Sequence, residues 1–450
     1  MKLDIFTGKR QYGMVLLVLI GVSCFAIKSG KKNYYSEDIP AEKPGFWLDH
    51  MDDPDRVILI PEQIKEMNAK IFKKAYIDHP FNEINRKKGS VIRSHLLHHL
   101  KWVGRFKKYN RYNQRINGMK FVRTMEQLMD IDRIPENINV RFGLVVHPTY
   151  LRIFPTDQMV MQKKNDHPFD ILQLSFLDTG EPLALYHISN DRKWGYILST
   201  HNTGWVKLED IALSFEKKKI RRFIECEPFV MAIDWEVPIY KKRSLDIIFN
   251  TVHMGSKLLL LEEKPEYFQV LLPERDFKGN LTFQYGYVKN NDQVSCHYLK
   301  MTPRTIARQS FRMLGEPYSW GGKKFNTDCS SFIKVVFRTM GLELPRNSYA
   351  QVRSLKNYRV SGKNRKKVMD TLKPFQTLLY ASDPGHIMLY IGEYLGQYYV
   401  IHNKWSFKAM VNQEEEEIFI KRTIVSDLAL GQDSSDGSLF ERIRRIGFFQ

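Results

Sequence analysis

Three residues near the C-terminal end of this 450-residue chain have the types and the order that thiol chemistry needs. Cys329 stands within Thr-Asp-Cys-Ser-Ser-Phe, and His386 and His402 follow it. In covalent catalysis a cysteine sulfur attacks a carbonyl carbon, one histidine takes the thiol proton, and a further polar residue orients that histidine. The order therefore predicts a nucleophile, a base and an orienting residue of the cysteine hydrolase type.

The nucleophile is predicted at the start of a helix. Asp328 is a suitable N-cap residue, and apolar side chains then recur at helical spacing until Gly341. These apolar residues are Phe332, Val335, Val336 and Met340. The positive end of the helix dipole favours a thiolate, so we expect the pKa of Cys329 to lie below its usual value of ~8.5. The free N–H groups of the first turn are also suited to a developing oxyanion.

The two histidines are predicted on neighbouring strands. Residues 386–391 and 397–402 alternate as strands, and the five residues 392–396 predict the hairpin loop between them. If Ile391 pairs with Gln397, the register places His386 directly opposite His402, with Cβ atoms roughly 4.5–5.5 Å apart. A one-residue shift would place the two rings on opposite faces of the sheet.

Four motifs in this region carry a family resemblance. They are Pro317-Tyr-Ser-Trp-Gly-Gly322, Thr327-Asp-Cys-Ser-Ser-Phe332, Leu344-Pro-Arg-Asn-Ser-Tyr-Ala-Gln351 and Pro384-Gly-His-Ile-Met-Leu-Tyr-Ile-Gly392. From about residue 302 onward the chain resembles the NlpC/P60 family of papain-like cysteine peptidases, which cut bacterial cell-wall peptides. The resemblance implies Cys329 as nucleophile, His386 as base and His402 as orienting residue, with no metal or organic cofactor.

The same resemblance extends to substrate binding. In members specific for γ-D-glutamyl bonds, the Asp before the nucleophile and nearby Ser residues help hold the free amine of a terminal L-Ala. These roles carry over to Asp328, Ser330 and Ser348. The Tyr318 hydroxyl is a candidate to reach the nucleophile, with a plain core aromatic as the alternative. Phe375-Gln376 stands where the family usually has Gly-Asp, which predicts an altered turn.

The expected fold class is α+β, with a papain-like NlpC/P60 catalytic domain at 301–450. A helical N-terminal segment at 36–138 precedes it, in which Pro61, Glu62 and the apolar spacing after them predict a helix. Two SH3-like β-barrels follow at 139–213 and 214–300, because short alternating strands are separated by turn residues. The first barrel is predicted from strands at 141–146, 151–155, 182–187, 194–199 and 204–208, and the second from 232–240 and 286–288.

This domain order resembles exported γ-D-glutamyl-L-diamino-acid endopeptidases. In such relatives the first barrel closes one end of the active-site groove and restricts the enzyme to peptides with a free N-terminal L-Ala. By that analogy, residues 150–155 or the loop at 191–194 are expected to line the groove here.

The N-terminal residues indicate the cellular compartment to which the protein is delivered. An apolar run from Met14 to Ile27 lies between basic residues, which is typical of a signal peptide at 1–30. Cys24 ends a stretch resembling a lipoprotein cleavage box, so a lipid anchor at Cys24 and an uncleaved membrane anchor stay open beside cleavage. Each alternative predicts export to the periplasm or cell envelope.

Composition adds weaker indications. Lys and Arg exceed Asp and Glu by 19, which suits either an anionic partner such as carboxylate-rich wall peptide or a generally basic surface. Nucleic acid is not expected as a partner, because no binding-fold signature accompanies the charge. Four cysteines cannot build a disulfide framework, and a Cys226–Cys296 bridge stays open. His95, His98 and His99 share a predicted helix, where a core-edge or solvated helix is favoured over a zinc site.

The sequence thus predicts hydrolysis of the γ-D-glutamyl–diaminopimelate bond of peptidoglycan stem peptides through an acyl-enzyme on Cys329. Two alternatives remain: a wall-binding protein with a silent peptidase domain, and a thiol acyltransferase of the same fold.

Overall fold

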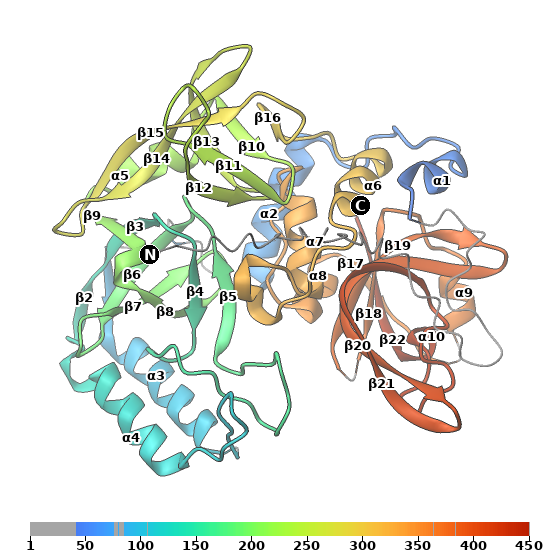
Figure 1. Ribbon diagram of the computed structural model, residues 1–450, viewed down its shortest axis with the longest axis horizontal. Helices are drawn as coiled ribbons and strands as arrows, with labels where there is room; N and C mark the ends of the chain where they lie inside the picture. Colours follow the sequence, from blue (N-terminus) through green and yellow to red (C-terminus); the bar gives the residue numbers. More distant parts are fainter. Residues whose placement is uncertain are drawn as a thin grey trace, which may run out of the picture.

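The computed structural model describes residues 42–75, 80, 85–105, 107–362, 364–382 and 384–449. The predicted signal or anchor segment at 1–30, with Cys24, lies outside these residues. Figure 1 shows three β-rich parts: a first sheet with two helices along one side, a second sheet beside it, and a third sheet that adjoins a group of helices. Within the described ranges, no helix has the length and apolar character needed to span a membrane.

The first sheet is antiparallel, in the order β5-β4-β8-β7-β6-β3-β9. Its strands are β3 (Arg141–Val145), β4 (Thr149–Arg152), β5 (Gln173–Leu177), β6 (Pro182–Ile188), β7 (Trp194–Ser199), β8 (Thr203–Lys207) and β9 (Ile211–Ser214), with a short η2 helix (Leu208–Asp210) before β9. Strand β5 does not show the usual alternation of buried apolar and exposed polar residues, because its polar residues Gln173 and Ser175 are buried. Both side chains contact the third part of the molecule.

The second sheet is also antiparallel, in the order β12-β11-β15-β14-β13-β10-β16. Its strands are β10 (Phe229–Ala232), β11 (Glu236–Tyr240), β12 (Ile248–His253), β13 (Lys257–Glu263), β14 (Tyr267–Arg275), β15 (Leu281–Lys289) and β16 (Val294–Ser295). Helix α5 (Lys217–Ile224) connects the two sheets and buries Ile220 and Phe223 against the first core. The second sheet closes over its own apolar core, which includes Val230, Ile239 and Val270.

The N-terminal segment predicted as one helical unit divides between two cores. Its elements are α1 (Pro44–Asp49), α2 (Pro61–Ala75), β1 (Arg86–Lys88), α3 (Gly89–Gly104), α4 (Gly118–Met129), η1 (Ile131–Arg133) and β2 (Asn137–Asn139). Trp47 of α1 and Ile71 of α2 join the core of the third part. Leu96 of α3 and Met125 of α4 instead join the core of the first sheet. Figure 1 shows α1 and α2 beside the third part of the molecule and α3 and α4 along the first sheet.

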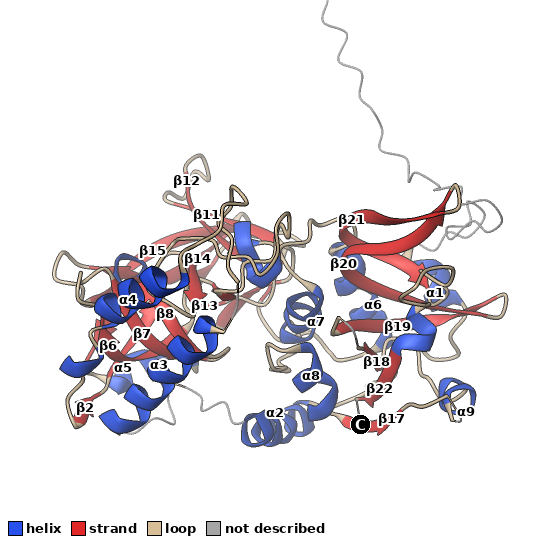
Figure 2. Cartoon of the chain, turned by 90° about the horizontal axis from the view of Figure 1, so that it is seen from below, coloured by secondary structure: helices blue, strands red, loops and turns tan. Residues whose placement is uncertain are grey.

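The third part holds the predicted catalytic residues. Its elements are α6 (Pro303–Arg312), η3 (Trp320–Phe325), α7 (Cys329–Arg338), α8 (Ser348–Ser354), β17 (Lys356–Arg359), α9 (Arg365–Met369), β18 (Thr377–Ala381), β19 (His386–Tyr394), β20 (Gln397–Val411), β21 (Glu414–Asp427), α10 (Leu439–Arg442) and β22 (Ile443–Phe448). The sheet order is β17-β22-β18-β19-β20-β21. Helices α6, α7 and α8 lie between this sheet and the two other sheets (Figures 1 and 2).

The β19–β20 hairpin differs in register from the prediction. Tyr394 pairs with Gln397, and Leu395 and Gly396 form a two-residue turn with positive φ angles of 50° and 73°. A bulge at Ile391 then shifts the pairing, so Leu389 lies opposite Ile401. The predicted five-residue loop and the direct His386–His402 pairing are therefore wrong. The difference from the predicted register is two residues, which preserves the sheet face of every side chain.

Phe375 lies in the turn before β18, and the altered turn that the sequence predicts there stays a prediction. Phe375 has a φ of 59°, a left-handed conformation that glycine adopts without cost. Its side chain is fully buried in the core beneath the helices, and its N–H donates to the Tyr390 carbonyl oxygen at 2.8 Å. Phe375 therefore combines a fully buried ring with a left-handed backbone conformation that is unfavourable for residues other than glycine.

Candidate active site

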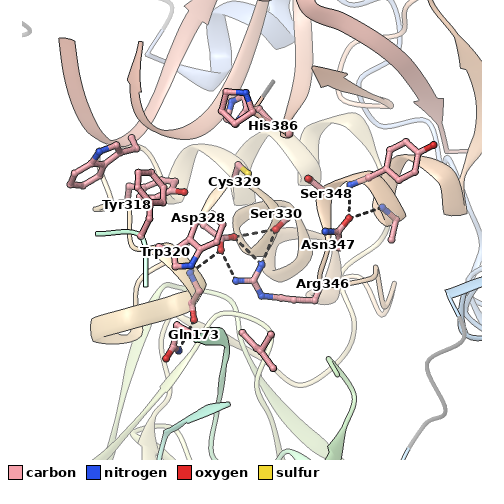
Figure 3. A pocket seen from close by; sticks show the side chains of 18 of the residues that line it. Gln173, Tyr318, Trp320, Asp328, Cys329, Ser330, Arg346, Asn347, Ser348 and His386 are labelled. Carbon is pink, nitrogen blue, oxygen red and sulfur yellow. Dashed lines mark hydrogen bonds and ion pairs between the residues drawn. The ribbon is translucent and has the colours of Figure 1, made fainter. Parts of the chain in front are cut away.

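Cys329 is the first residue of α7, as the sequence predicts. Asp328 is the N-cap, and it forms a capping box with Ser331 in which each side chain bonds the other residue's backbone N–H. The Cys329 side chain points from the helix start toward the His386 ring (Figure 3). The backbone N–H of Ile387 also donates to the Cys329 sulfur, so the nucleophile is tied to the strand that carries the histidine.

The expected fall in the cysteine pKa is wrong for the resting site. Burial raises the pKa of Cys329 to about 12, and the neighbouring Asp328 carboxylate acts in the same direction. The Ile387 N–H and the cations of Arg346 and Lys404 act in the opposite direction without prevailing. Desolvation outweighs the helix dipole here, although Cys329 keeps part of its surface open to the cavity. The raised pKa favours the thiol over the thiolate at Cys329.

A directed hydrogen-bond chain orients His386. His386 Nε2 lies 2.7 Å from His402 Nδ1, and His402 Nε2 lies 3.1 Å from Ser426 Oγ. Ser426 in turn donates to the Asp427 carbonyl oxygen at 3.1 Å. Because that oxygen only accepts, the protons are assigned along the chain in one direction: Ser426 accepts from His402, and His402 accepts from His386. The Nδ1 atom of His386 is then the free acceptor of the pair.

Both histidines are held neutral. Burial lowers the pKa of His386 well below its usual value, and the charge of Lys404 adds to the effect. Burial and Lys404 likewise lower the pKa of His402. A neutral His386 whose Nδ1 accepts a proton is the form that a general base requires.

The carboxylate of Asp328 is already fully engaged inside the protein. Arg346 donates to both of its oxygens, at 3.0 and 2.5 Å, in a fork-to-fork ion pair. Ser330 Oγ donates to Oδ1 at 3.1 Å, and the Gly321 N–H donates to Oδ2 at 3.1 Å. Burial raises the pKa of Asp328, but Arg346 and the Ser331 bonds hold it below the usual value. The Asp328 carboxylate therefore holds together the residues around Cys329, from Gly321 to Arg346.

The other predicted substrate residues line one cavity of about 730 Å³ with Cys329 and His386. Ser330, Ser348 and Tyr318 all lie on its wall (Figure 3). Ser330 is tied to Asp328 and Arg346, whereas Ser348 begins α8 after the N-cap Asn347. Burial raises the pKa of Tyr318, and the nearby Cys329 adds to it, which places the phenol close to the nucleophile.

The first sheet closes one side of this cavity. Phe169, Ile171, Gln173 and Leu174 line it from the chain before and within β5, together with His201 and Asn202 after β7. The expected lining residues at 150–155 and 191–194 are absent from the wall that the described residues form. Tyr150 instead stacks on Phe325, and Arg192 borders a different cavity. The expectation placed the wall on the wrong loops, because β5 was not predicted as a strand.

The motif Trp320-Gly321-Gly322 docks on β5. Gly321 and Gly322 have φ angles of 62° and 77°, and a Cβ on either would lie 2.5 Å from a side-chain carbon of Gln173 or Phe176. Gln173 Nε2 donates to the Gly321 carbonyl oxygen at 3.0 Å, and Trp320 Nε1 donates to the Asp170 carbonyl oxygen at 3.0 Å. Both glycines are therefore required by conformation and by close approach.

Four residues with contacts around the candidate site were not predicted from the sequence: Arg346, Asn403, Lys404 and Ser426. Asn403 donates to the Thr327 carbonyl and hydroxyl oxygens at 3.2 and 2.8 Å, which ties β20 to the residues before Cys329. Arg346 lies within the motif at 344–351 and Asn403 directly follows His402, so their positions could have marked both residues as part of the site. Ser426 lies on β21, and nothing in its sequence context marks it.

The remaining candidates lie away from this cavity. His95 Nδ1 lies 2.7 Å from the Tyr196 hydroxyl, at the contact of α3 with the first sheet. Cys226 and Cys296 are both free thiols.

The profile described as NlpC/P60 family matches residues 315–427, and the profile described as SH3 domain (SH3b1 type) matches residues 159–207. The first of these ranges holds Cys329, His386 and His402. The second includes β5, which contacts the cavity.

Two relatives carry the name gamma-D-glutamyl-L-lysine dipeptidyl-peptidase. The one from Bacillus subtilis (strain 168) is 30% identical over 122 residues, which cover 26% of this chain and 38% of the relative. The one from Bacillus cereus (strain ATCC 10987 / NRS 248) is 29% identical over 182 residues, which cover 37% and 48%. The match therefore spans less than half the length of each relative.

A solved structure shares the fold over most of the chain. It is described as an NlpC/P60 endopeptidase from Photobacterium damselae subsp. piscicida and has a TM-score of 0.74 at 22% identity. The alignment covers 90% of this chain and 96% of that one.

Proposed function

We propose, starting from a chain that holds an NlpC/P60 domain joined to an SH3b domain, that it hydrolyses the γ-D-glutamyl–diamino acid bond of peptidoglycan stem peptides. The observation that carries the proposal is the Cys329 thiol at the start of α7, facing His386, which a hydrogen bond of 2.7 Å joins to His402. The names of the two Bacillus relatives support the bond class. We also regard the second sheet as a second SH3-like barrel.

The proposed reaction has two halves. His386 Nδ1 takes the Cys329 proton as the sulfur attacks the γ-carbonyl carbon of the D-glutamyl residue. N–H groups at the start of α7 stabilise the oxyanion, and the protonated His386 gives its proton to the leaving amine. Water, activated by His386, then releases the glutamyl peptide from the thioester. His402 and Ser426 keep the proton on Nε2 of His386, so that Nδ1 exchanges protons with the reacting groups.

The cavity shape supports restriction to short peptides with a free N-terminal L-Ala. The first sheet walls the cavity at Phe169 and Gln173, so a long extension of the peptide toward that wall has no room. Asp328 is fully bonded to Arg346, Ser330, Ser331 and Gly321. The amine of an N-terminal L-Ala bound beside Asp328 would therefore meet a carboxylate whose charge is already balanced by Arg346.

Export belongs to the proposal as well. The apolar run from Met14 to Ile27 with its basic flanks supports delivery to the periplasm or cell envelope, with the membrane anchor or lipid at Cys24 as the alternatives.

A digest of defined stem peptides tests the function. L-Ala-γ-D-Glu-diaminopimelate and the same peptide blocked at its N-terminal amine are incubated with the protein, and the products are identified by mass. We expect L-Ala-γ-D-Glu and free diamino acid from the first peptide and much slower cleavage of the second. Binding to wall polymer without any cleavage would favour the silent wall-binding alternative, and a product joined to an added amine would favour acyl transfer.

A further inference from the structure

One lysine lies almost fully buried in the cavity beside the nucleophile. Lys404 is 7% exposed and lines the cavity with Cys329 and His386. It follows His402 by two residues on β20, and side chains two apart on a strand share one face of the sheet. Continuing the register of Leu389 with Ile401 toward the cavity brings His386 opposite Lys404. The lysine therefore belongs to the same wall as the catalytic histidines.

The charge of Lys404 acts on each catalytic group. It lowers the pKa of His386, His402 and Cys329. Burial and then Arg442 lower its own pKa to about 8, while Cys329 and Asp436 act in the opposite direction. Burial and the positive charge of Arg442 thus outweigh the charge of Asp436 at this ammonium.

Among the described residues, no carboxylate forms an ion pair with this cation. Within the part of the chain that the structure describes, the Lys404 ammonium makes no hydrogen bond or ion pair. Asp436 is paired with Lys408 at 3.2 Å, and Asp328, the one acidic residue on the described cavity wall, is paired with Arg346. A buried charge without a partner is costly to keep. Its place in the cavity indicates that the partner arrives with the ligand.

We propose that the Lys404 ammonium is a carboxylate subsite that binds a free carboxylate of the peptide near the scissile bond. The proposal rests on the proposed function and names the feature of the substrate that the site selects. A γ-linked glutamyl residue keeps its α-carboxylate free, a few bonds from the scissile carbonyl. A diaminopimelyl residue carries an extra side-chain carboxylate that lysine lacks. Both sources present the same chemistry to the ammonium.

Three tripeptides separate the two sources. They are L-Ala-γ-D-Glu-diaminopimelate, the same peptide with the glutamyl α-carboxylate amidated, and the same peptide with L-Lys in the third position. The value of kcat/KM is measured for each with the unaltered protein and with Lys404→Met and Lys404→Gln. Lys404→Arg keeps the charge, and Lys408→Met removes a lysine of the same strand that is already ion-paired and lies off the described cavity wall.

We expect the unaltered protein to cleave one of the two modified peptides about 10- to 100-fold more slowly than the parent, as for loss of a hydrogen bond between charged groups. Lys404→Met and Lys404→Gln should cleave that peptide and the parent at similar rates, because the cation that discriminates is gone. Lys404→Arg and Lys408→Met should keep the discrimination. The modified peptide that shows the effect identifies the carboxylate that is bound.

Each ratio is taken within one variant, so a general loss of activity cancels. If the neutral variants discriminate among the three peptides as the unaltered protein does, or if the unaltered protein does not discriminate at all, the subsite is overturned while the proposed function stands. If the unaltered protein cleaves none of the three, the proposed function fails and the subsite fails with it.

Discussion

The Nε2 atom of His386 lies 2.7 Å from the Nδ1 atom of His402. This contact joins two strands of one hairpin and continues through Ser426 to a backbone carbonyl oxygen. It assigns the protons so that the Nδ1 atom of His386 is the free acceptor. The orientation of the base therefore depends on the register of β19, β20 and β21.

The histidine chain predicts graded losses of activity. His402→Ala should lower kcat by about 10²- to 10⁴-fold, because the base loses its tautomer and its orientation. Ser426→Ala should lower kcat by only about 2- to 10-fold, since it removes one neutral hydrogen bond at the far end. Steady-state kinetics with the tripeptide measures both changes. A Ser426→Ala loss equal to that of His402→Ala would contradict the assigned order of the chain.

The Asp328–Arg346 pair predicts a coupled loss of stability. Arg346→Met leaves a buried carboxylate without its cation, and breaking such a pair costs about 3 to 5 kcal/mol. Replacing both residues, as Asp328→Asn with Arg346→Met, should recover most of that loss because no charge is left unpaired. The measurement is urea unfolding of Arg346→Met, Asp328→Asn and the double variant, with exposed Arg359→Met as the matched control. Additive effects of the two single changes would contradict the coupling.

Acid should destabilise the fold from about pH 6.5 downward. Among the histidines that the structure describes, six have lowered pKa values, mainly through burial, and one has a raised value. The lowered ones are His95, His99, His187, His201, His386 and His402, and the raised one is His253. Below pH 6.5 the unfolded chain binds protons that the folded chain refuses, so each lowered histidine reduces the unfolding free energy by up to about 1.4 kcal/mol per pH unit.

The check is the midpoint of thermal unfolding from pH 8 to pH 5. We expect it to fall as the pH drops below 6.5. His386→Asn, which cannot take the proton, should show a shallower fall than the unaltered chain. Identical slopes for the two proteins would contradict a neutral, buried His386.

The thiol pKa predicts slow alkylation. Because the pKa of Cys329 is raised to about 12, iodoacetamide should modify it slowly at pH 7 and faster with each further pH unit. Peptide mapping by mass spectrometry follows this cysteine separately from Cys226 and Cys296. Rapid modification that is already level at pH 6 would indicate a preformed thiolate–imidazolium pair and would refute the neutral resting state.

Much of the catalytic core was predictable because local patterns decide it. The apolar spacing after Asp328 and the stop at Gly341 placed α7, and strand alternation put the two histidines on one face. The hairpin register was wrong by two residues, since neither the turn at Leu395 and Gly396 nor the bulge at Ile391 is visible in alternation. The geometry survived because an even shift preserves the face.

Contacts between parts of the chain were not predictable in the same way. Strand β5 buries Gln173 and Ser175 because they bond the catalytic part: Gln173 donates to the Gly321 carbonyl, and Arg346 donates to Ser175 at 3.0 Å. From the sequence alone, such polar residues indicate a loop, because the partners that bury them lie elsewhere in the chain. The cavity wall at Phe169 and the cysteine pKa depend on the same packing, which no local pattern describes.

Cleavage of L-Ala-γ-D-Glu-diaminopimelate by the unaltered protein and by Cys329→Ala tests the central claim most directly. Products are identified by mass, and the unfolding midpoint of each protein is measured alongside. We predict L-Ala-γ-D-Glu and free diaminopimelate from the unaltered protein, and no product from a Cys329→Ala variant that unfolds at the same temperature. Continued cleavage at this bond by the folded variant would contradict the account.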